Sequence, residues 1–145
     1  MYDTILLPVA PGGTANDAVP HVRSLAERYD ATVHVVAAVD TIEHTLGGPR
    51  VGSLSGRVES GARKRVEEVT ADLESAGIDV VGEVIHGEPL RVIDNAITDN
   101  DVDLVVMPTH SRTGLQRVLL GSVTEKTVRT SPVPVVTVPI RDPDE

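Results

Sequence analysis

Residues 107–126 read MPTHSRTGLQRVLLGSVTEK, and this stretch is the most informative part of the chain. It leaves an apolar run at residues 103–107 and enters a helical pattern at Gly121 and Ser122. Backbone N–H groups at the start of a helix, preceded by glycine, form a binding site for an anion. The stretch therefore predicts a strand, a binding loop and a helix in succession.

Side chains in the same stretch fit this interpretation, but they also fit a simpler one. Arg112 and Arg117 would add positive charge to an anion site, and Ser122 and Thr124 would add hydroxyl donors. However, Ser122 and Glu125 also have the spacing of a capping box, which needs no ligand. Local features alone leave both interpretations open.

Apolar runs and helical patterns alternate on both sides of this stretch. Continuous apolar runs predict strands at residues 2–9, 31–39, 78–85, 103–107 and 133–138. Apolar residues at every third or fourth position predict helices at residues 14–30, 58–76, 89–97 and 122–129. The glycine-rich and serine-rich residues 41–56 predict a mobile loop. The alternation indicates one α/β domain over residues 1–145, with an open five-stranded parallel sheet covered by helices on both faces.

The expected sheet also predicts where a ligand would bind. In open α/β sheets, ligands bind beyond the carboxyl ends of the strands, where the strand order reverses. The segments to consider are therefore residues 10–14, the residues from Asp40 onward, and residues 108–122.

The composition narrows the class of protein. The 145 residues include no Cys, Phe or Trp, which excludes disulfides, thiolate metal sites and aromatic platforms that include Phe or Trp for stacking nucleic-acid bases. A formal net charge of -9 disfavours binding to DNA. No apolar run is long enough for a membrane span and no basic leader precedes the first strand, so we expect a cytoplasmic protein. The chain has 22 acidic residues and 13 basic ones, and only two of the basic residues are Lys. An acidic surface with few lysines suits a protein that works at high salt, so we expect a halophilic source. An ordinary acidic protein is the alternative.

Several segments resemble the universal stress protein family. Residues 4–8 (TILLP) are similar to the family's first strand, and residues 84–89 (VIHGEP) to the turn after its third strand. Residues 109–123, followed by Glu125-Lys126 and by SPVPV at 131–135, are similar to its hallmark segment. The resemblance implies a Rossmann-like sheet in the order 3-2-1-4-5, a homodimer and a role in the cytoplasmic stress response. One branch of the family binds ATP and another does not.

The ATP-binding branch has a glycine motif that this chain matches only in its second half. The motif reads Gly, two residues, Gly, nine residues, Gly and then Ser or Thr; the corresponding residues here are Pro108, Ser111, Gly121 and Ser122. Pro108 has no N–H to donate, and Ser111 does not readily take the positive φ that glycine allows. The first strand of nucleotide binders ends in Pro-x-Asp, whereas Ala10 supplies no acceptor for the nucleoside. Two interpretations stay open: a protein tuned by an adenine nucleotide, and an interaction or regulatory module that has lost nucleotide binding.

For an adenine nucleotide such as ATP, the resemblance assigns residues to three parts of the ligand. The phosphates would lie at the start of the last helix, at Gly121, Ser122, Val123 and Thr124. The triphosphate, with magnesium accompanying it, would lie beside His110, Ser111 and Arg112, and Pro108 is also counted among the nucleotide-binding residues. The base and ribose would lie against Pro8, Ala10, Ala38 and Met107. Asp40 either faces the nucleoside or is a solvated loop residue.

The remaining residues form no recognisable catalytic or metal-binding constellation. Residues 99–103 (DNDVD) begin like a calcium loop, but Leu104 and His110 occupy the positions that need Gly and Glu, so a polar turn is the better interpretation. The five histidines have no metal-ligand spacing, and we expect no metal site. The sequence has no nucleophile elbow and no Walker A lysine. We therefore predict a non-catalytic protein, with a slow nucleotide hydrolase as a third interpretation.

The last predicted strand bears on the oligomeric state. Four valines would lie at an unpaired edge of the sheet, which invites pairing with another chain: Val133, Val135, Val136 and Val138. The resemblance implies antiparallel pairing of these strands across a dimer axis. Prolines at 132, 134 and 139 offer the alternative of a blunted edge and a monomer. We expect the homodimer, because the valines would otherwise lie at an unpaired edge.

Overall fold

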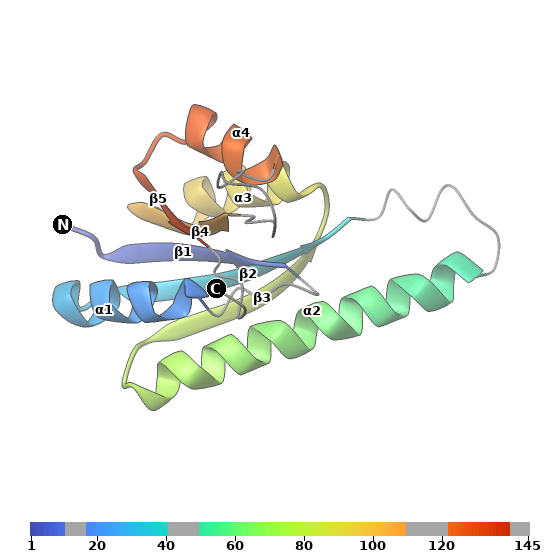
Figure 1. Cartoon of the computed structure of the whole chain (residues 1–145), viewed down its shortest axis with the longest axis horizontal. Helices are drawn as coiled ribbons and strands as arrows, with labels where there is room; N and C mark the ends of the chain where they lie inside the picture. The colour runs from blue at the N-terminus through green and yellow to red at the C-terminus, as the bar shows by residue number, and fades with distance from the viewer. Residues whose placement is uncertain (11–16, 41–49, 110–121, 140–145) are drawn as a thin grey trace.

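A computed structural model describes residues 1–10, 17–40, 50–109 and 122–139, and its architecture is a parallel sheet between two layers of helices (Figure 1). The strands are β1 (Thr4–Val9), β2 (Thr32–Val39), β3 (Val80–His86), β4 (Leu104–Thr109) and β5 (Val135–Pro139). The helices are α1 (Val19–Tyr29), α2 (Arg50–Ser75), α3 (Pro89–Asp99) and α4 (Ser122–Thr130). The strands are parallel and their order is β3-β2-β1-β4-β5, so the predicted fold class and strand order are confirmed.

Alternate residues of the central strand β1 contribute to two aliphatic cores. Ile5 and Leu7 are fully buried in the core that α1 and α2 cover, and Leu6 is fully buried in the core on the α3 side. The two helix pairs lie on opposite faces of the sheet (Figure 1). Burying one such side chain stabilises the fold by about 1.5–3 kcal/mol. Tyr2 and Tyr29 add an edge-to-face contact with ring centroids 5.0 Å apart.

Proline and glycine lie at helix ends, although α1 begins at Val19 and not at the predicted residue 14, and residues 14–16 lie outside the described part of the chain. Pro20 and Pro89 lie in the first turns of α1 and α3, where a helix has no acceptor for the missing N–H. Beyond α2, Gly77 has a φ of 81°, and the N–H of Ile78 donates to the carbonyl oxygen of Leu73 at 3.2 Å. This is the hydrogen-bond pattern of a helix that ends on a left-handed glycine.

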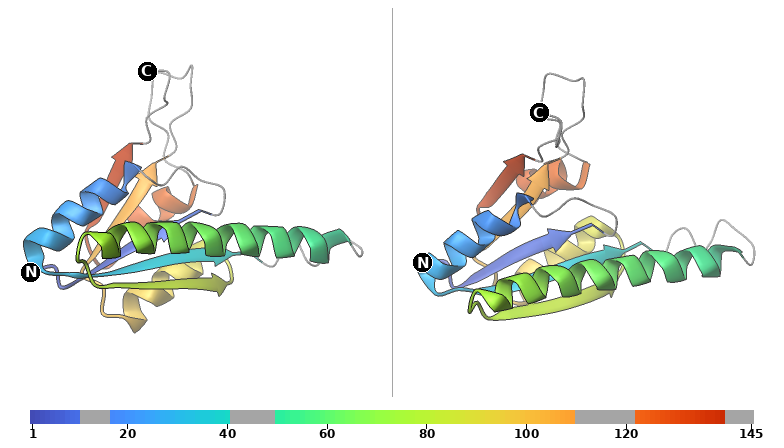
Figure 2. Two further views of the ribbon diagram at one scale, coloured as in Figure 1. Left: turned by 90° about the horizontal axis from the view of Figure 1, so that it is seen from below. Right: turned by 60° about the horizontal axis from the view of Figure 1, so that its bottom comes forward.

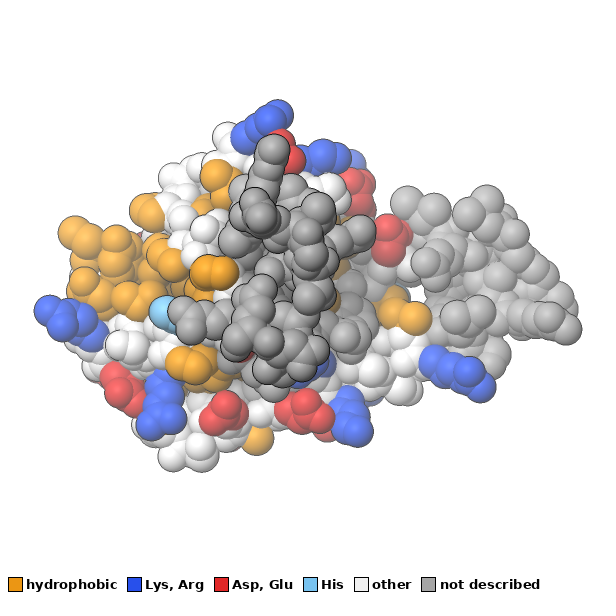
Figure 3. Space-filling view, in the orientation of Figure 1, with side chains coloured by type: hydrophobic (Ala, Val, Ile, Leu, Met, Phe, Trp, Pro, Cys, Tyr) orange, Lys and Arg blue, Asp and Glu red, His pale blue; other side chains and the backbone are white. Residues whose placement is uncertain are grey.

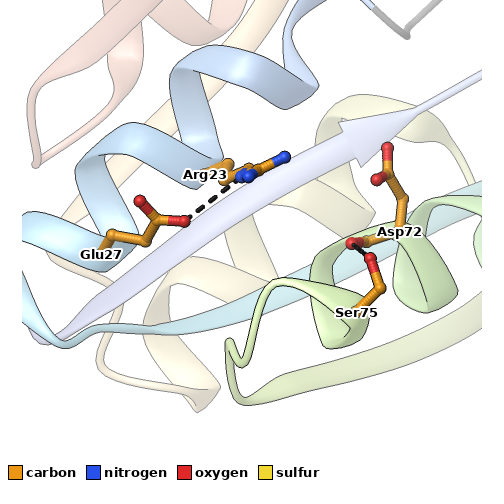
Figure 4. A network of polar contacts seen from close by, with 4 residues as sticks. All are labelled: Arg23, Glu27, Asp72 and Ser75. Atoms are coloured by element: carbon orange, nitrogen blue, oxygen red, sulfur yellow. Dashed lines mark hydrogen bonds and ion pairs between the residues drawn. The ribbon is translucent and has the colours of Figure 1, made fainter.

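Two polar contacts on α1 and α2 are local and exposed (Figure 4). On α1, Arg23 Nε donates to Glu27 Oε1 at 3.2 Å, and the helix ends as predicted at Asp30, whose φ is 53°. In the last turn of α2, Ser75 Oγ donates to the carbonyl oxygen of Asp72 at 2.6 Å. An exposed pair on a helix contributes about 0.3–0.5 kcal/mol, so the two cores contribute far more to stability than these contacts do.

The predicted loop at 41–56 is wrong over its second half. Residues 50–56 form the first turns of α2, and residues 41–49 lie outside the described part of the chain. Glycine and serine favour loops only weakly, at about 1 kcal/mol or less per residue relative to alanine. Val51 and Leu54 continue the three-to-four spacing of the apolar residues that follow Val58, and this periodicity was the better guide.

The predicted strand boundaries are displaced by a few residues. Ala31 and Ile78 were assigned to strands because they are apolar; they are buried but lie just before β2 and β3. In the other direction, His86 still pairs with β2, so β3 extends past its apolar run. On α3, the buried residues are Val92, Ile93, Ala96 and Ile97, whereas Leu90 is only half-buried. Hydropathy alone therefore locates a strand but not the residues that pair.

The long helix α2 lies against the edge strand β3 and extends past the strands at the carboxyl end of the sheet (Figure 2). Gly82 makes the close approach possible, because a Cβ there would lie 2.7 Å from Val66 Cγ1 and 2.8 Å from Thr70 Oγ1. Within the described residues, Thr70 Oγ1 is buried without a hydrogen-bond partner. Shape, rather than hydrogen bonding, therefore holds this part of α2 on β3.

Candidate functional site

The strand order reverses at the carboxyl ends of β1 and β4. β1 pairs with β2 on one side, where Val9 lies opposite Ala37, and with β4 on the other, where Leu6 lies opposite Val105. The chain builds β2 and β3 to one side of β1, and β4 and β5 to the other. In such sheets the helix connections diverge at this point, and the gap between them is the usual ligand site.

The residues predicted to contact the base and ribose lie at this edge with different exposure. Pro8 of β1 and Ala38 of β2 are half-buried, and Ala10, which follows β1, is exposed. Met107 is buried and packs in the core on the α3 side, against which Ala38 also packs. Asp40 follows β2 and is half-buried. Ala10 is thus accessible to a ligand, whereas Met107 supports the edge from within.

The first turn of α4 is attached to the end of β4. Thr124 is buried, and its Oγ1 donates to the carbonyl oxygen of Pro108 at 3.3 Å. Val123 packs against the core on the α3 side, and its carbonyl oxygen accepts from Thr127 Oγ1 at 2.8 Å. Ser122 is exposed. The first N–H groups of a helix have no acceptor within that helix, so this turn presents donors beside the end of β4.

The other residues predicted for the triphosphate cannot be placed in the same way. His110, Ser111, Arg112 and Gly121 lie outside the described residues. Pro108, which replaces the first glycine of the motif, is half-buried and continues β4 opposite Val138. The structure therefore brings Pro108 and Thr124, which lie at the two ends of the predicted phosphate-binding segment, into contact.

The predicted dimer strand β5 is an edge strand of the sheet in the described chain. Val138 is buried, and Val135 and Val136 are half-buried against the two cores. Val133 is half-buried and precedes the strand, which begins only at Val135. Val135, Val136 and Val138 therefore lie in an edge strand, as expected, with their side chains packed inward, and Thr137 is the exposed residue between them.

Residues 99–103 form a polar turn at the opposite, amino-terminal edge of the sheet. Asp101 has a φ of 50°, and Asp103 Oδ2 accepts from the N–H groups of Asp3 at 2.9 Å and Thr4 at 3.0 Å. This carboxylate ties the turn to the start of β1. In the part of the chain that the structure describes, no group of three or more His, Asp or Glu side chains is placed to hold a metal ion.

One polar contact at the carboxyl edge was missed by sequence reasoning. His86, the last residue of β3, contacts Glu59 of α2 with 2.6 Å between Nε2 and Oε1. The two residues are 27 positions apart, and no local pattern pairs them. They become neighbours because α2 packs against β3.

The acidic excess is not gathered into one patch on the face shown in Figure 3. Acidic and basic side chains are interspersed over α1 and α2, and hydrophobic side chains gather at the end where the chain begins. Among the described residues, no helix has the length and apolar character needed to cross a membrane. This surface therefore shows no single charged platform for a polyanion.

Comparison with known proteins identifies the family. The sequence model of the universal stress protein family matches residues 1–139. The chain belongs to the universal stress protein family. Universal stress protein MJ0531 of Methanocaldococcus jannaschii is 29% identical over 141 residues, which cover 95% of this chain and 82% of that protein. The solved structure of MJ0577 from the same organism matches with a TM-score of 0.81 and 29% identity, covering 98% of this chain and 99% of that one.

Two more distant structures share the fold of this universal stress protein and contain nucleotides. A universal stress protein in complex with cAMP matches with a TM-score of 0.70 and 21% identity, covering 94% of this chain and 97% of that one. A family member from Arabidopsis thaliana with AMP bound matches with a TM-score of 0.71 and 16% identity, covering 98% of this chain and 94% of that one. These likenesses establish the common architecture of the sheet and its helices.

Proposed function

We propose that this universal stress protein binds an adenine nucleotide at the edge between β1 and β4 and acts in the cytoplasm without catalysis. The observation that carries the proposal is the hydrogen bond from Thr124 Oγ1 to the carbonyl oxygen of Pro108, which holds the first turn of α4 beside the end of β4. The N–H groups and dipole of that turn favour a phosphate. The AMP and cAMP complexes of proteins with the same fold support this ligand class.

The described side chains suit a nucleoside next to such a phosphate. Pro8, Ala10 and Ala38 present small apolar surfaces on β1 and β2, against which a planar base packs without displacing a charged group. Asp40 offers a carboxylate at the end of β2. Small-molecule sites commonly combine an apolar wall with a few polar groups that fix orientation. Residues 110–112 and Gly121 complete the proposed site, and magnesium would accompany the phosphates.

Calorimetric titration with ATP, AMP and cAMP, with and without magnesium, tests the proposal. Mass spectrometry of small molecules released from the denatured protein complements it. We expect a micromolar Kd or stoichiometric nucleotide. Two variants separate the donors, because Ser122→Ala removes only the hydroxyl whereas Ser122→Pro also removes an N–H at a position where helices tolerate proline. Ser122→Pro should bind up to about tenfold more weakly than Ser122→Ala, as expected for one lost hydrogen bond.

A second function, an interaction module without a nucleotide, has its own supporting observation. The exposed Ala10 offers no acceptor at the end of β1, and Pro108 offers no N–H at the end of β4. Under this alternative the folded protein gives no heat of binding at millimolar ATP and releases no nucleotide on denaturation. That outcome would direct the search to protein partners.

The absence of catalysis is tested with the same samples. We expect ATP to be released unchanged, with phosphate production no faster than in buffer. Hydrolysis above this background that is lost in Ser122→Ala or Arg112→Ala would instead favour a slow nucleotide hydrolase.

The proposal includes a homodimer that pairs through the backbone of β5. The N–H of Val105 donates to the carbonyl oxygen of Pro134, so the strand alternation directs the backbone groups of Val136 and Val138 toward β4. The N–H of Thr137 then points to the open side. Thr137→Pro removes that donor, and Thr137→Ala is the matched control. Light scattering during gel filtration should show dimers for the wild type and Thr137→Ala and monomers for Thr137→Pro; a monomeric wild type would contradict the proposal.

We further propose that residues 1–145 unfold as one domain. Both aliphatic cores take residues from β1, so neither can be lost alone without exposing that strand. Circular dichroism and intrinsic tyrosine fluorescence should therefore report one coincident transition. Two separated transitions would show that the chain divides into independent units.

A further inference from the structure

The edge strand β3 exposes three consecutive residues in its middle. Val81, Gly82 and Glu83 are all exposed, although neighbouring side chains of a strand point to opposite faces of the sheet. Gly82 has no side chain, so the exposed surface at this residue is backbone. In the described chain, β3 pairs with β2 on one side and lies at the margin of the sheet (Figure 2). The outer side of this strand is therefore accessible to solvent.

The hydrogen bonds to β2 show which backbone groups of β3 point outward. The N–H of Val33 donates to the carbonyl oxygen of Asp79, and the N–H of Gly87 donates to the carbonyl oxygen of Val39. Odd-numbered residues of this segment thus direct their backbone groups toward β2. These directions alternate along a strand, so the even-numbered residues direct their N–H and carbonyl groups away from β2. They are Val80, Gly82, Val84 and His86.

The two edge strands are protected from pairing to different degrees. Natural edge strands commonly carry proline, lysine or bulges that discourage pairing with other chains. β5 ends in Pro139, and prolines also stand at positions 132 and 134 just before it. β3 reads VVGEVIH, with no proline and no lysine over its length. β3 therefore keeps its capacity to pair with an extended segment of another chain, which is a common mode of peptide recognition.

Two contacts show which side of α2 borders this edge. A Cβ on Gly82 would lie 2.8 Å from Thr70 Oγ1, and Oε1 of Glu59 lies 2.6 Å from Nε2 of His86. Glu59 and Thr70 are separated by about three helical turns, so they lie along one side of the helix. This side of α2 therefore follows β3 along the strand.

Carboxylates outnumber basic groups around the edge among the described residues. Glu67 and Glu74 lie within about one turn of Thr70 on the same side of α2, and both are exposed. Arg63 is an exposed basic residue on that side. Because Gly82 faces α2, the next residue, Glu83, presents its exposed carboxylate on the other face of the sheet. A segment placed beside β3 would thus meet carboxylates from both faces.

We propose that β3 binds an extended basic segment of a partner protein, which adds to the sheet as a further strand. The outward N–H and carbonyl groups of β3 provide the main-chain hydrogen bonds, and the carboxylates on the two faces select lysine or arginine side chains. A second copy of this chain fits less well, because its own β3 would bring the same carboxylates to the interface. The binding requires neither the proposed nucleotide nor the proposed pairing of β5.

Hydrogen exchange resolved by NMR for single amides tests the proposal on the intact protein without nucleotide. The probe is the synthetic peptide TKVKKVKT, which is about as long as β3 and places lysines on both faces of an added strand. The peptide TEVEEVET is the charge control. We expect saturating TKVKKVKT to slow exchange of the Gly82 and Val84 amides by up to about tenfold. The amides of Val81 and Glu83 already point to β2 and should change little.

Substitutions separate backbone pairing from charge. Val84→Pro removes an outward N–H, and Val84→Ala is the matched control for the lost side chain. The proline variant should bind TKVKKVKT up to about tenfold more weakly than Val84→Ala. Glu67→Gln combined with Glu74→Gln should weaken binding about two- to tenfold at the lowest KCl concentration that keeps the protein folded, and molar KCl should remove this difference. Glu27→Gln combined with Glu125→Gln, on other helices, should leave binding unchanged.

The charge variants and the exchange pattern keep the proposal testable even where Val84→Pro does not fold. No binding of TKVKKVKT, equal binding of TEVEEVET, or unchanged binding in the Glu67 and Glu74 variant would overturn it. Protection at Thr137 of β5 without protection at Gly82 would place the peptide at the other edge of the sheet and would also overturn it. Protection of Gly82 that rises with protein concentration in the absence of peptide would show instead that β3 pairs with a second copy.

Discussion

Replacing Ala10 by Asp asks whether the end of β1 limits nucleotide affinity. Ala10 is exposed and follows the last residue of β1, so a carboxylate fits there without entering either aliphatic core. The resemblance to nucleotide-binding universal stress proteins places an Asp at this position. The substitution therefore supplies the acceptor for nucleoside hydroxyls that this chain lacks.

The expected gain follows from the exposure of position 10. A hydrogen bond to a charged acceptor contributes about 1.5–3 kcal/mol, and an exposed position favours the lower value, which corresponds to roughly tenfold in Kd. The new carboxylate also repels the phosphates. At a separation of roughly 8 Å in water, two unit charges cost about 0.5 kcal/mol, and molar salt screens much of this repulsion. The gain should therefore be larger for AMP than for ATP.

Calorimetric titration of the wild type, Ala10→Asp and Ala10→Asn with AMP and ATP measures this effect. Ala10→Asn has nearly the same shape without the charge and should gain less than Ala10→Asp. The melting temperatures of the three proteins should agree, because position 10 lies outside the cores. Equal AMP affinity of the wild type and Ala10→Asp, with both proteins folded, would refute the reasoning that a missing acceptor weakens the site.

Four further measurements test the packing and the salt dependence. Asp103→Ala removes the acceptor of two backbone N–H groups and should lower the free energy of unfolding by about 2–3 kcal/mol in a urea titration, whereas the exposed Asp99→Ala should change it by about 0.5 kcal/mol or less. Gly82→Ala would bring a Cβ to 2.7 Å from Val66 Cγ1 and should cost about 1–3 kcal/mol; an unchanged midpoint would show that α2 yields freely. Thr70→Val removes a hydroxyl that is buried without a partner among the described residues and should stabilise the protein by about 1 kcal/mol, with destabilisation as the contrary result. Molar KCl should raise the melting temperature of a chain with a net charge of -9 if it is adapted to salt; a flat response would contradict the predicted halophilic source.

The parts of the fold that were predictable are those that neighbouring residues determine. Pro89 starts a helix and Gly77 ends one because of their own backbone chemistry, and both act where the sequence indicated. The strand order came from the resemblance to a family, since no rule based on neighbouring residues says which strands lie on either side of β1. The residues at 110–112 and Gly121 stay predictions, and the structure places only their neighbours Pro108 and Ser122.

The parts that failed depend on contacts between distant segments. Residues 50–56 look like a loop by composition, yet they extend a helix that the sheet supports further along. Val135 and Val136 lie at the sheet edge as expected, but hydropathy did not show that the cores on the two faces receive their side chains. The contact of Glu59 with His86 joins residues 27 positions apart, which become neighbours only when α2 packs on β3.

The two edges of the sheet differ in a way that separates stability from ligand binding. At the amino-terminal edge, backbone hydrogen bonds link Thr32 to Asp3 and Asp103 to Thr4, and the carboxylate of Asp103 adds two more. At the carboxyl edge, Ala10 is exposed and contributes to neither core. A substitution at Ala10 is therefore expected to change affinity for the proposed nucleotide at little cost in folding free energy, because function resides in a site and not in the fold as a whole. A variant such as Ala10→Asp should then shift Kd at constant melting temperature, and Asp103→Ala should lower the melting temperature at constant Kd.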